Sequence, residues 1–130
     1  MGHDSYICGF IKLSDIEKAL EAIAQLPTSS EEDDWPFLTS SMFSYTSSPV
    51  YRTEVIHFAA SYKNICESWD EWELKFEALT DHFNYEEVKI LVEDDHMGDF
   101  LIIWRAPIKG RLMRRRLDFE REEDWEGYPF

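Results

Sequence analysis

Basic side chains are scarce in this sequence. Its 130 residues contain 13 lysines and arginines against 27 aspartates and glutamates, and the formal net charge at pH 7 is −14. This charge makes an approach to DNA, to RNA or to an anionic membrane unfavourable. We therefore expect a basic protein as the partner, with no direct binding to nucleic acid or membrane. The alternative that the acidity serves only solubility stays open.

Cysteine is nearly absent. Cys8 and Cys66 have neither CxxC spacing nor a neighbouring histidine, which argues against a disulfide framework and against a structural zinc site. We expect two buried thiols in a reducing compartment, and no metal or other cofactor.

Long apolar runs and targeting signals are lacking too. The first residues have neither the basic nor the apolar segment of a secretory leader, and no run approaches the roughly 18 apolar residues of a membrane span. These features predict a soluble, cytoplasmic protein.

Glycine and proline are few, with five of each, whereas 44% of the residues are hydrophobic and 15% are aromatic. This composition is typical of a folded chain and not of a disordered acidic segment. A length of 130 residues suffices for one domain with its own core. We expect an α+β domain over residues 1–106, with residues 107–130 as a C-terminal segment packed on it.

The C-terminal segment differs from the rest in charge. Residues 105–130 hold seven of the thirteen basic side chains and six acidic ones, which leaves six basic and twenty-one acidic side chains in residues 1–104. The arginines between residues 111 and 116 are candidates for binding nucleic acid, but the field of the whole chain opposes this. We expect the apolar side chains of the segment to hold it against the acidic domain instead.

Apolar periodicity predicts five strands and two helices. The order is a buried strand over residues 6–13, a helix that starts at Ser14 and ends before Pro27, strands over 37–45 and 50–62, a helix from Ser68, and strands over 87–93 and 100–104. This is the order of the split βαβ, ferredoxin-like plan with an extra C-terminal strand. We predict two helices on one face of an antiparallel sheet.

Both helices are expected to begin at a capping box, in which a serine and the glutamate three residues later bond to each other's backbone N–H groups. The boxes are Ser14 with Glu17 and Ser68 with Glu71.

The second helix contains an apolar stripe at spacings of three and four: Trp69, Trp72, Phe76, Leu79 and Phe83. We expect Trp72 in the core. Trp69 lies on the first turn and is a candidate for the core or for the surface.

Signatures of catalysis are missing. The sequence has no GxGxxG, Walker A, HExxH or GxSxG motif. His57 is a candidate general base without a nucleophile in a known motif, and the turn at residues 94–99 offers three aspartates and a histidine to a divalent cation without the EF-hand spacing. We predict that the protein is not an enzyme, and keep an enzyme or metal-dependent sensor as the alternative.

Carboxylates gather in four sequence patches, and three of these contain tryptophan. Tryptophan is favoured at the centres of protein interfaces, and carboxylates around it steer a cationic partner toward it. The residues predicted to contact the partner are Glu31, Glu32, Asp33, Asp34, Trp35, Trp69, Asp70, Glu71 and Glu73.

In size, acidity and order of elements over residues 5–104, the chain resembles the small acidic immunity proteins of bacterial contact-dependent and other polymorphic toxin systems. The resemblance implies an inhibitor that neutralises a nuclease-type toxin. Mixed polar and apolar side chains on both faces of the strand over residues 50–62 are compatible with a monomer or a homodimer. A phage-encoded inhibitor of a host nuclease defence has a similar composition and is an alternative. Ferredoxin-like domains also serve as enzymes and small-ligand sensors, which is the third possibility.

Overall fold

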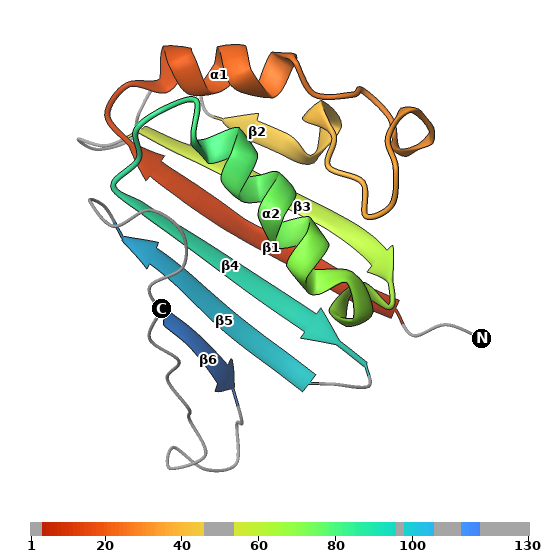
Figure 1. Cartoon of the computed structure of the whole chain (residues 1–130). Helices are drawn as coiled ribbons and strands as arrows, with labels where there is room; N and C mark the ends of the chain where they lie inside the picture. Colours follow the sequence, from red (N-terminus) through yellow and green to blue (C-terminus); the bar gives the residue numbers. More distant parts are fainter. Residues whose placement is uncertain (1–3, 46–53, 96–97, 106–112, 118–130) are drawn as a thin grey trace.

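The computed structural model describes residues 4–45, 54–95, 98–105 and 113–117 (Figure 1). The main elements are β1 (Asp4–Leu13), α1 (Ile16–Ala24), β2 (Phe43–Tyr45), β3 (Glu54–Lys63), α2 (Trp69–Thr80), β4 (Glu87–Asp94), β5 (Gly98–Arg105) and β6 (Met113–Leu117). Short 3₁₀ turns occur at Ser30–Glu32, Ser40–Met42 and Ile65–Ser68.

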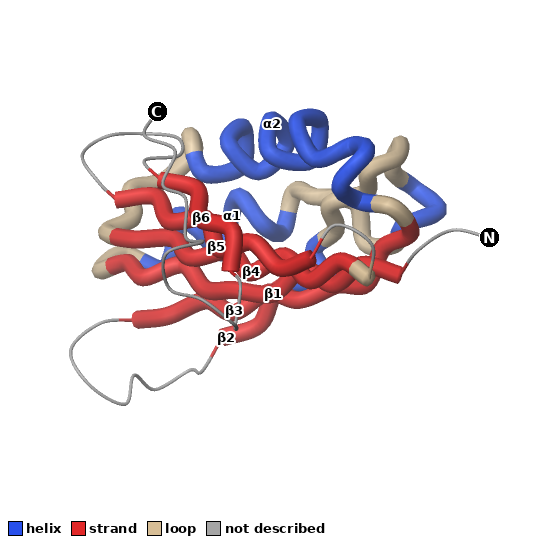
Figure 2. Tube along the Cα trace, turned by 90° about the horizontal axis from the view of Figure 1, so that it is seen from below, coloured by secondary structure: helices blue, strands red, loops and turns tan. Residues whose placement is uncertain are grey.

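The strands form one six-stranded sheet in the order β2-β3-β1-β4-β5-β6, and every neighbouring pair is antiparallel. Helix α1 links β1 to β2, and α2 links β3 to β4. Both helices lie on the same face of the sheet (Figures 1 and 2). The prediction of an α+β fold with an antiparallel sheet and two helices is therefore confirmed.

Strand β1 is half buried, because the helices cover only one face of the sheet. Ile7, Ile11 and Leu13 point into the core, whereas Tyr6 and Cys8 are exposed on the face away from the helices, which we call the outer face. The prediction of a buried first strand is therefore wrong for this face. The prediction of two buried thiols is wrong for Cys8, which is exposed, and Cys66 is half-buried. A strand alternates its side chains between two faces, so burial on both would need a second covering layer.

Aromatic rings on α2 and on the strands beneath it pack against one another in the core. Trp72 and Phe76 have no exposed surface and stack at 5.1 Å between ring centroids. Trp69 stacks on Trp72 at 5.0 Å, and Trp104 of β5 meets Phe76 edge-on at 5.4 Å. The apolar stripe predicted for this helix, including the core position of Trp72, is confirmed.

Neither helix is capped as predicted. Helix α1 has Asp15 as its N-cap, and no side chain bonds to its first turn. Ser68 is the N-cap of α2 but likewise makes no side-chain cap bond. Its hydroxyl is engaged elsewhere, as described below.

Strand β6 places part of the arginine-rich segment in the sheet. It pairs with β5 from Ile103 opposite Met113 to Asp99 opposite Leu117. The sequence analysis missed this strand, because three consecutive arginines interrupt the alternation of apolar and polar residues that indicates a strand. Apart from this strand, residues 107–130 and their expected packing on the domain lie outside the described residues, as does the connection at residues 46–53 between the strands expected over 37–45 and 50–62.

Candidate functional site: an acidic surface around Trp35

Two acidic segments that are far apart in the sequence lie side by side in the fold. The indole N–H of Trp35 donates to the hydroxyl of Ser68 at 2.9 Å. Lys75 Nζ donates to Asp33 Oδ2 at 2.9 Å and to the backbone oxygen of Asp34 at 2.7 Å. The loop after α1 is thereby attached to the first two turns of α2.

Trp35 is half exposed yet held in one orientation. Its relative exposure is 46%. The ring meets Phe37 edge-on at 6.0 Å and Tyr62 edge-on at 5.8 Å, in addition to the bond to Ser68. An aromatic ring that is fixed before binding loses little conformational entropy on binding, which favours it as an anchor for a partner.

Five of the predicted contact carboxylates are exposed, on the loop of Trp35 and on the first turn of α2. Glu31, Glu32 and Asp34 lie on the loop, and Asp70 and Glu71 lie on the first turn of α2. Glu71 stands four residues before Lys75 on the helix and therefore on the side of α2 that faces the loop. Asp70 stands five residues before Lys75, about 140° around the helix and away from the loop. We call Glu31, Glu32, Asp34 and Glu71 with Trp35 the acidic surface.

Asp33 has a structural role within the loop. Its carboxylate accepts the backbone N–H of Leu38 at 2.9 Å as well as the Lys75 ammonium. Partial burial opposes the charge, but these two hydrogen bonds outweigh it and lower the pKa of Asp33 below its ordinary value. The group therefore stays ionised and fixes the loop rather than facing a partner.

Two of the predicted contact residues are not accessible. Glu73 is 1% exposed and Trp69 is 9% exposed. Both belong to the inner face of α2, together with Trp72, Phe76 and Thr80, at the helical spacings of three and four. The prediction that Glu73 lies on the surface rested on its charge alone and was wrong.

Tyr62 supports the loop from the core. Its hydroxyl accepts the indole N–H of Trp72 at 2.9 Å and donates to the backbone oxygen of Phe37 at 2.8 Å. The pKa of Tyr62 is raised, mainly by burial and further by the charge of Asp33. The hydrogen bond from Trp72 lowers it but does not cancel these two effects. Tyr62 and Lys75 were not singled out from the sequence, and Ser68 was predicted only as a helix cap, because their bonds to the loop join residues 25 to 42 positions apart.

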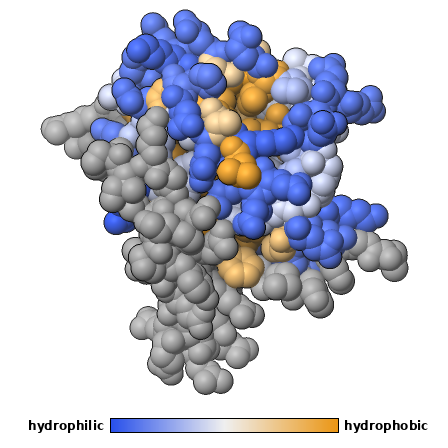
Figure 3. Space-filling model, in the orientation of Figure 1, coloured by the Kyte–Doolittle hydropathy of each residue, from blue (hydrophilic) through white to orange (hydrophobic). Residues whose placement is uncertain are grey.

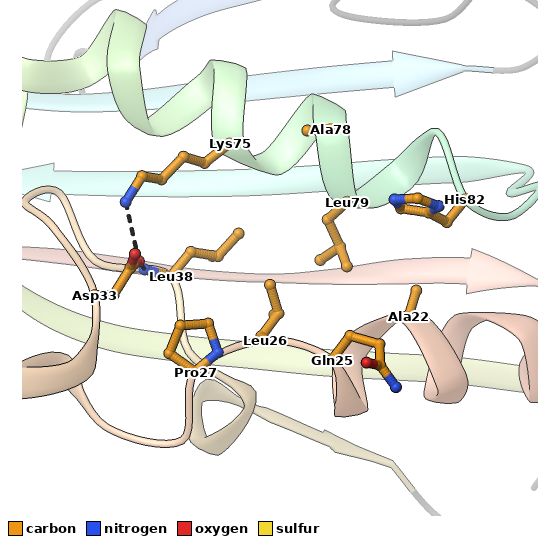
Figure 4. Close-up of a pocket in the computed structure, with 10 residues that line it drawn as sticks. All are labelled: Ala22, Gln25, Leu26, Pro27, Asp33, Leu38, Lys75, Ala78, Leu79 and His82. Carbon is orange, nitrogen blue, oxygen red and sulfur yellow. Dashed lines mark hydrogen bonds and ion pairs between the residues drawn. The ribbon is translucent and has the colours of Figure 1, made fainter.

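A shallow apolar groove of about 300 Å³ adjoins the acidic surface between α1 and α2. In Figure 4 the pair of Asp33 and Lys75 stands at one end of the groove and His82 at the other. Figure 3 shows hydrophobic residues reaching the surface between the two helices, with hydrophilic residues around them. The groove is lined by Ala22, Gln25, Leu26, Pro27, Asp33, Leu38, Lys75, Ala78, Leu79 and His82. It offers room for an apolar side chain of a partner.

The alternative sites gain little support. His57 is exposed on the outer face, opposite Phe10 and Ser44 in the strand register. Asp94 is buried and accepts the hydroxyl of Ser5 at 2.7 Å, and His96 lies outside the described residues. Within residues 4–45, 54–95, 98–105 and 113–117, no three acidic, histidine or cysteine side chains gather as metal ligands would.

In the described part of the chain, no helix combines the length and the apolar sequence needed to cross a membrane. Comparisons with protein-family models, with curated proteins and with solved structures found no match.

Proposed function

We propose that the protein is a non-enzymatic inhibitor that binds the basic site of a protein partner through the acidic surface. A nuclease-type toxin is the partner class we favour, so the role would be that of an immunity protein in the cytoplasm. The observation that carries the proposal is the fixed, half-exposed Trp35 among carboxylates from two chain segments. A site built to accept phosphates also accepts carboxylates held on a rigid scaffold.

The charge of the surface fits this role. Four exposed carboxylates lie on the two chain segments that meet at Trp35, while Lys75 is already paired with Asp33. Such a field raises the association rate with a basic partner and disfavours nucleic acid as the direct ligand. An inhibitor of a host nuclease defence would use the same surface, so the two roles differ in the partner and not in the chemistry.

We also propose that the fold is of the ferredoxin-like split βαβ kind. Each helix links two strands that flank a third, because β3 lies between β1 and β2 and β1 lies between β3 and β4. Strands β5 and β6 then extend one side of the sheet, where the sequence analysis expected one extra strand.

The test is capture followed by inhibition. The tagged protein is used to retain partners from a lysate of its own cells at low salt, and the retained protein is then assayed for cleavage of DNA or RNA. We expect one basic partner, bound in a stoichiometric complex, released by salt and inhibited by an equimolar amount of this protein. A retained partner whose activity is unaffected by saturating protein would contradict an inhibitory role.

Charge reversal decides whether the acidic surface makes the contact. In the variant Glu31→Lys, Glu32→Lys, Asp34→Lys, association should slow by about tenfold or more at low ionic strength and lose most of its salt dependence.

The control reverses three exposed glutamates outside the acidic surface, Glu17→Lys, Glu21→Lys and Glu86→Lys, with the same change in net charge. It should retain most of the association rate. Equal slowing of both triple variants would assign the effect to overall charge and exclude a specific surface.

A further inference from the structure

The outer face of the sheet has an apolar band across its middle. Cys8 lies in register between Ala59 of β3 and Leu91 of β4, and Leu91 lies opposite Leu101 of β5. On either side of this row, the half-buried Phe10 extends the band in one direction and Tyr6, 47% exposed, extends it in the other. Ile103 is on the same face but is only 9% exposed. An apolar band flanked by charged residues is the usual pattern of an interface.

The two ends of the outer face carry opposite charge. One end has Lys12, Lys89 and Arg105 with a single acidic residue, Glu87, which pairs with Arg105 at 2.9 Å. The other end has one lysine, Lys63, among the acidic residues Asp4, Glu93, Asp95 and Asp99. The face is therefore positive at one end of its strands and negative at the other.

We propose that this face binds a second copy of the chain in a two-fold, face-to-face dimer. We place the two-fold axis between the two sheets, perpendicular to the strands and along the row of Cys8 and Leu91. A residue on one side of this row then faces, in the second copy, the residue of the same strand that lies at the same distance on the other side of the row. Lys89 then lies over Glu93 of the second copy, Lys12 over its Asp4, and Phe10 over its Tyr6. An axis along the strands would instead bring like charges together.

The proposal does not depend on the proposed function. The acidic surface belongs to the helix-covered side of the sheet, so the dimer leaves it open on both copies. Two chains with a net charge of −14 repel one another as a whole. The experiment is therefore done near physiological ionic strength, where charges more than about 8 Å apart are largely screened.

The first test is a charge swap read by sedimentation equilibrium. The wild-type protein should be a dimer. Lys89→Glu and Glu93→Lys should each weaken the dimer by about tenfold or more, and the double variant should recover most of that loss. Urea unfolding of each variant checks that the monomer still folds. A wild-type protein that stays monomeric at every concentration, or a double variant as weak as its parents, would overturn the proposal.

The second test uses the two cysteines. Cys8 lies on the proposed axis, so a short bis-maleimide should join two copies through Cys8. Cys66, which lies in the 3₁₀ turn before α2, serves as the control. Partial burial and the charge of Glu93 raise the pKa of the Cys8 thiol, so the reaction is run at mildly alkaline pH.

Cross-linking should survive Cys66→Ser and disappear in Cys8→Ser. Cross-linking through Cys66 would overturn the proposed geometry. A monomer whose Cys8 reacts only after unfolding would show that another segment of the same chain covers the outer face, and would also overturn the dimer.

Discussion

The hydroxyl of Ser68 receives its hydrogen bond from the indole of Trp35, 33 residues earlier in the chain, and makes no cap bond to its own helix. The residue at the start of α2 thus fixes an aromatic ring on a separate loop. Since Trp35 is otherwise half exposed, this bond is part of what presents the ring to a partner in one orientation.

Trp35→Ala should weaken binding to the captured partner by about 2 kcal/mol or more, as expected for a central aromatic anchor. Trp35→Phe keeps a ring but removes the bond to Ser68, and should lose less. Isothermal titration with the partner measures both. Tyr45→Ala is the control, since Tyr45 is also 46% exposed but lies on β2 outside the acidic surface. Equal losses for Tyr45→Ala and Trp35→Ala would remove Trp35 from the contact.

Tyr62→Phe should lower the free energy of unfolding by about 1–3 kcal/mol, because the indole N–H of Trp72 and the backbone oxygen of Phe37 both lose their partner inside the fold. Urea denaturation measures the change. Tyr45→Phe, which removes a hydroxyl from an exposed side chain on β2, should change stability by less than about 0.5 kcal/mol. A neutral Tyr62→Phe would mean that the hydroxyl does not support the loop.

The bonds of Asp33 should stabilise the fold only while its carboxyl is ionised. Because its pKa is lower in the folded protein than the ordinary value of 3.8, its stabilisation is complete above the unfolded pKa and is lost as the pH falls through the lower folded pKa. Asp33→Asn should therefore destabilise the protein by about 1–2 kcal/mol at pH 7. The difference from wild type should shrink as the pH falls below about 4.

Asp34→Asn provides the comparison for this titration, because Asp34 contributes its backbone oxygen and not its carboxylate to Lys75. Asp34→Asn should leave the free energy of unfolding nearly unchanged both at pH 7 and below about pH 4. A penalty for Asp33→Asn that stays constant down to pH 3 would contradict the role of the ionised carboxylate.

Gly9→Ala should destabilise the sheet by about 3 kcal/mol, as overpacking of a close contact does. A Cβ at this position would overlap the carbonyl oxygen of Lys89 on the neighbouring strand and would lie 2.8 Å from Phe58 Cζ. Thermal unfolding measures the loss, and Ser14→Ala, at an exposed position directly after β1, should be much milder. Wild-type stability in Gly9→Ala would mean that β1 and β4 separate readily.

Periodicity accounts for the part of the fold that was predicted from sequence. The stripe from Trp69 to Phe83 and the alternation of Val88, Ile90 and Val92 identify a helix and a strand, since burial on one side repeats with the local geometry. Capping could not be predicted in the same way. Ser68 has the sequence of a cap, but a bond from a distant residue competes for its hydroxyl.

The two segments of the candidate site were each predicted from the sequence, but their contact in the fold was not. This contact depends on the hydrogen bonds from Trp35 to Ser68 and from Lys75 to Asp33. No local sequence pattern predicts a bond between residues more than 30 positions apart. Glu73 was predicted on the surface because it is charged, although its position in the helix faces the core. Spacing was the better guide than residue type at this position.

Strand β6 is the outermost strand at its side of the sheet in the part of the chain that the structure describes, and its sequence includes Arg114, Arg115 and Arg116. An outermost strand has backbone groups open to pairing with a strand from another molecule, which is a common route to aggregation. Consecutive arginines oppose such pairing by mutual repulsion between the incoming and resident strands. The three arginines that conceal the strand from periodicity are thus, by their sequence, of the charged type that disfavours such pairing.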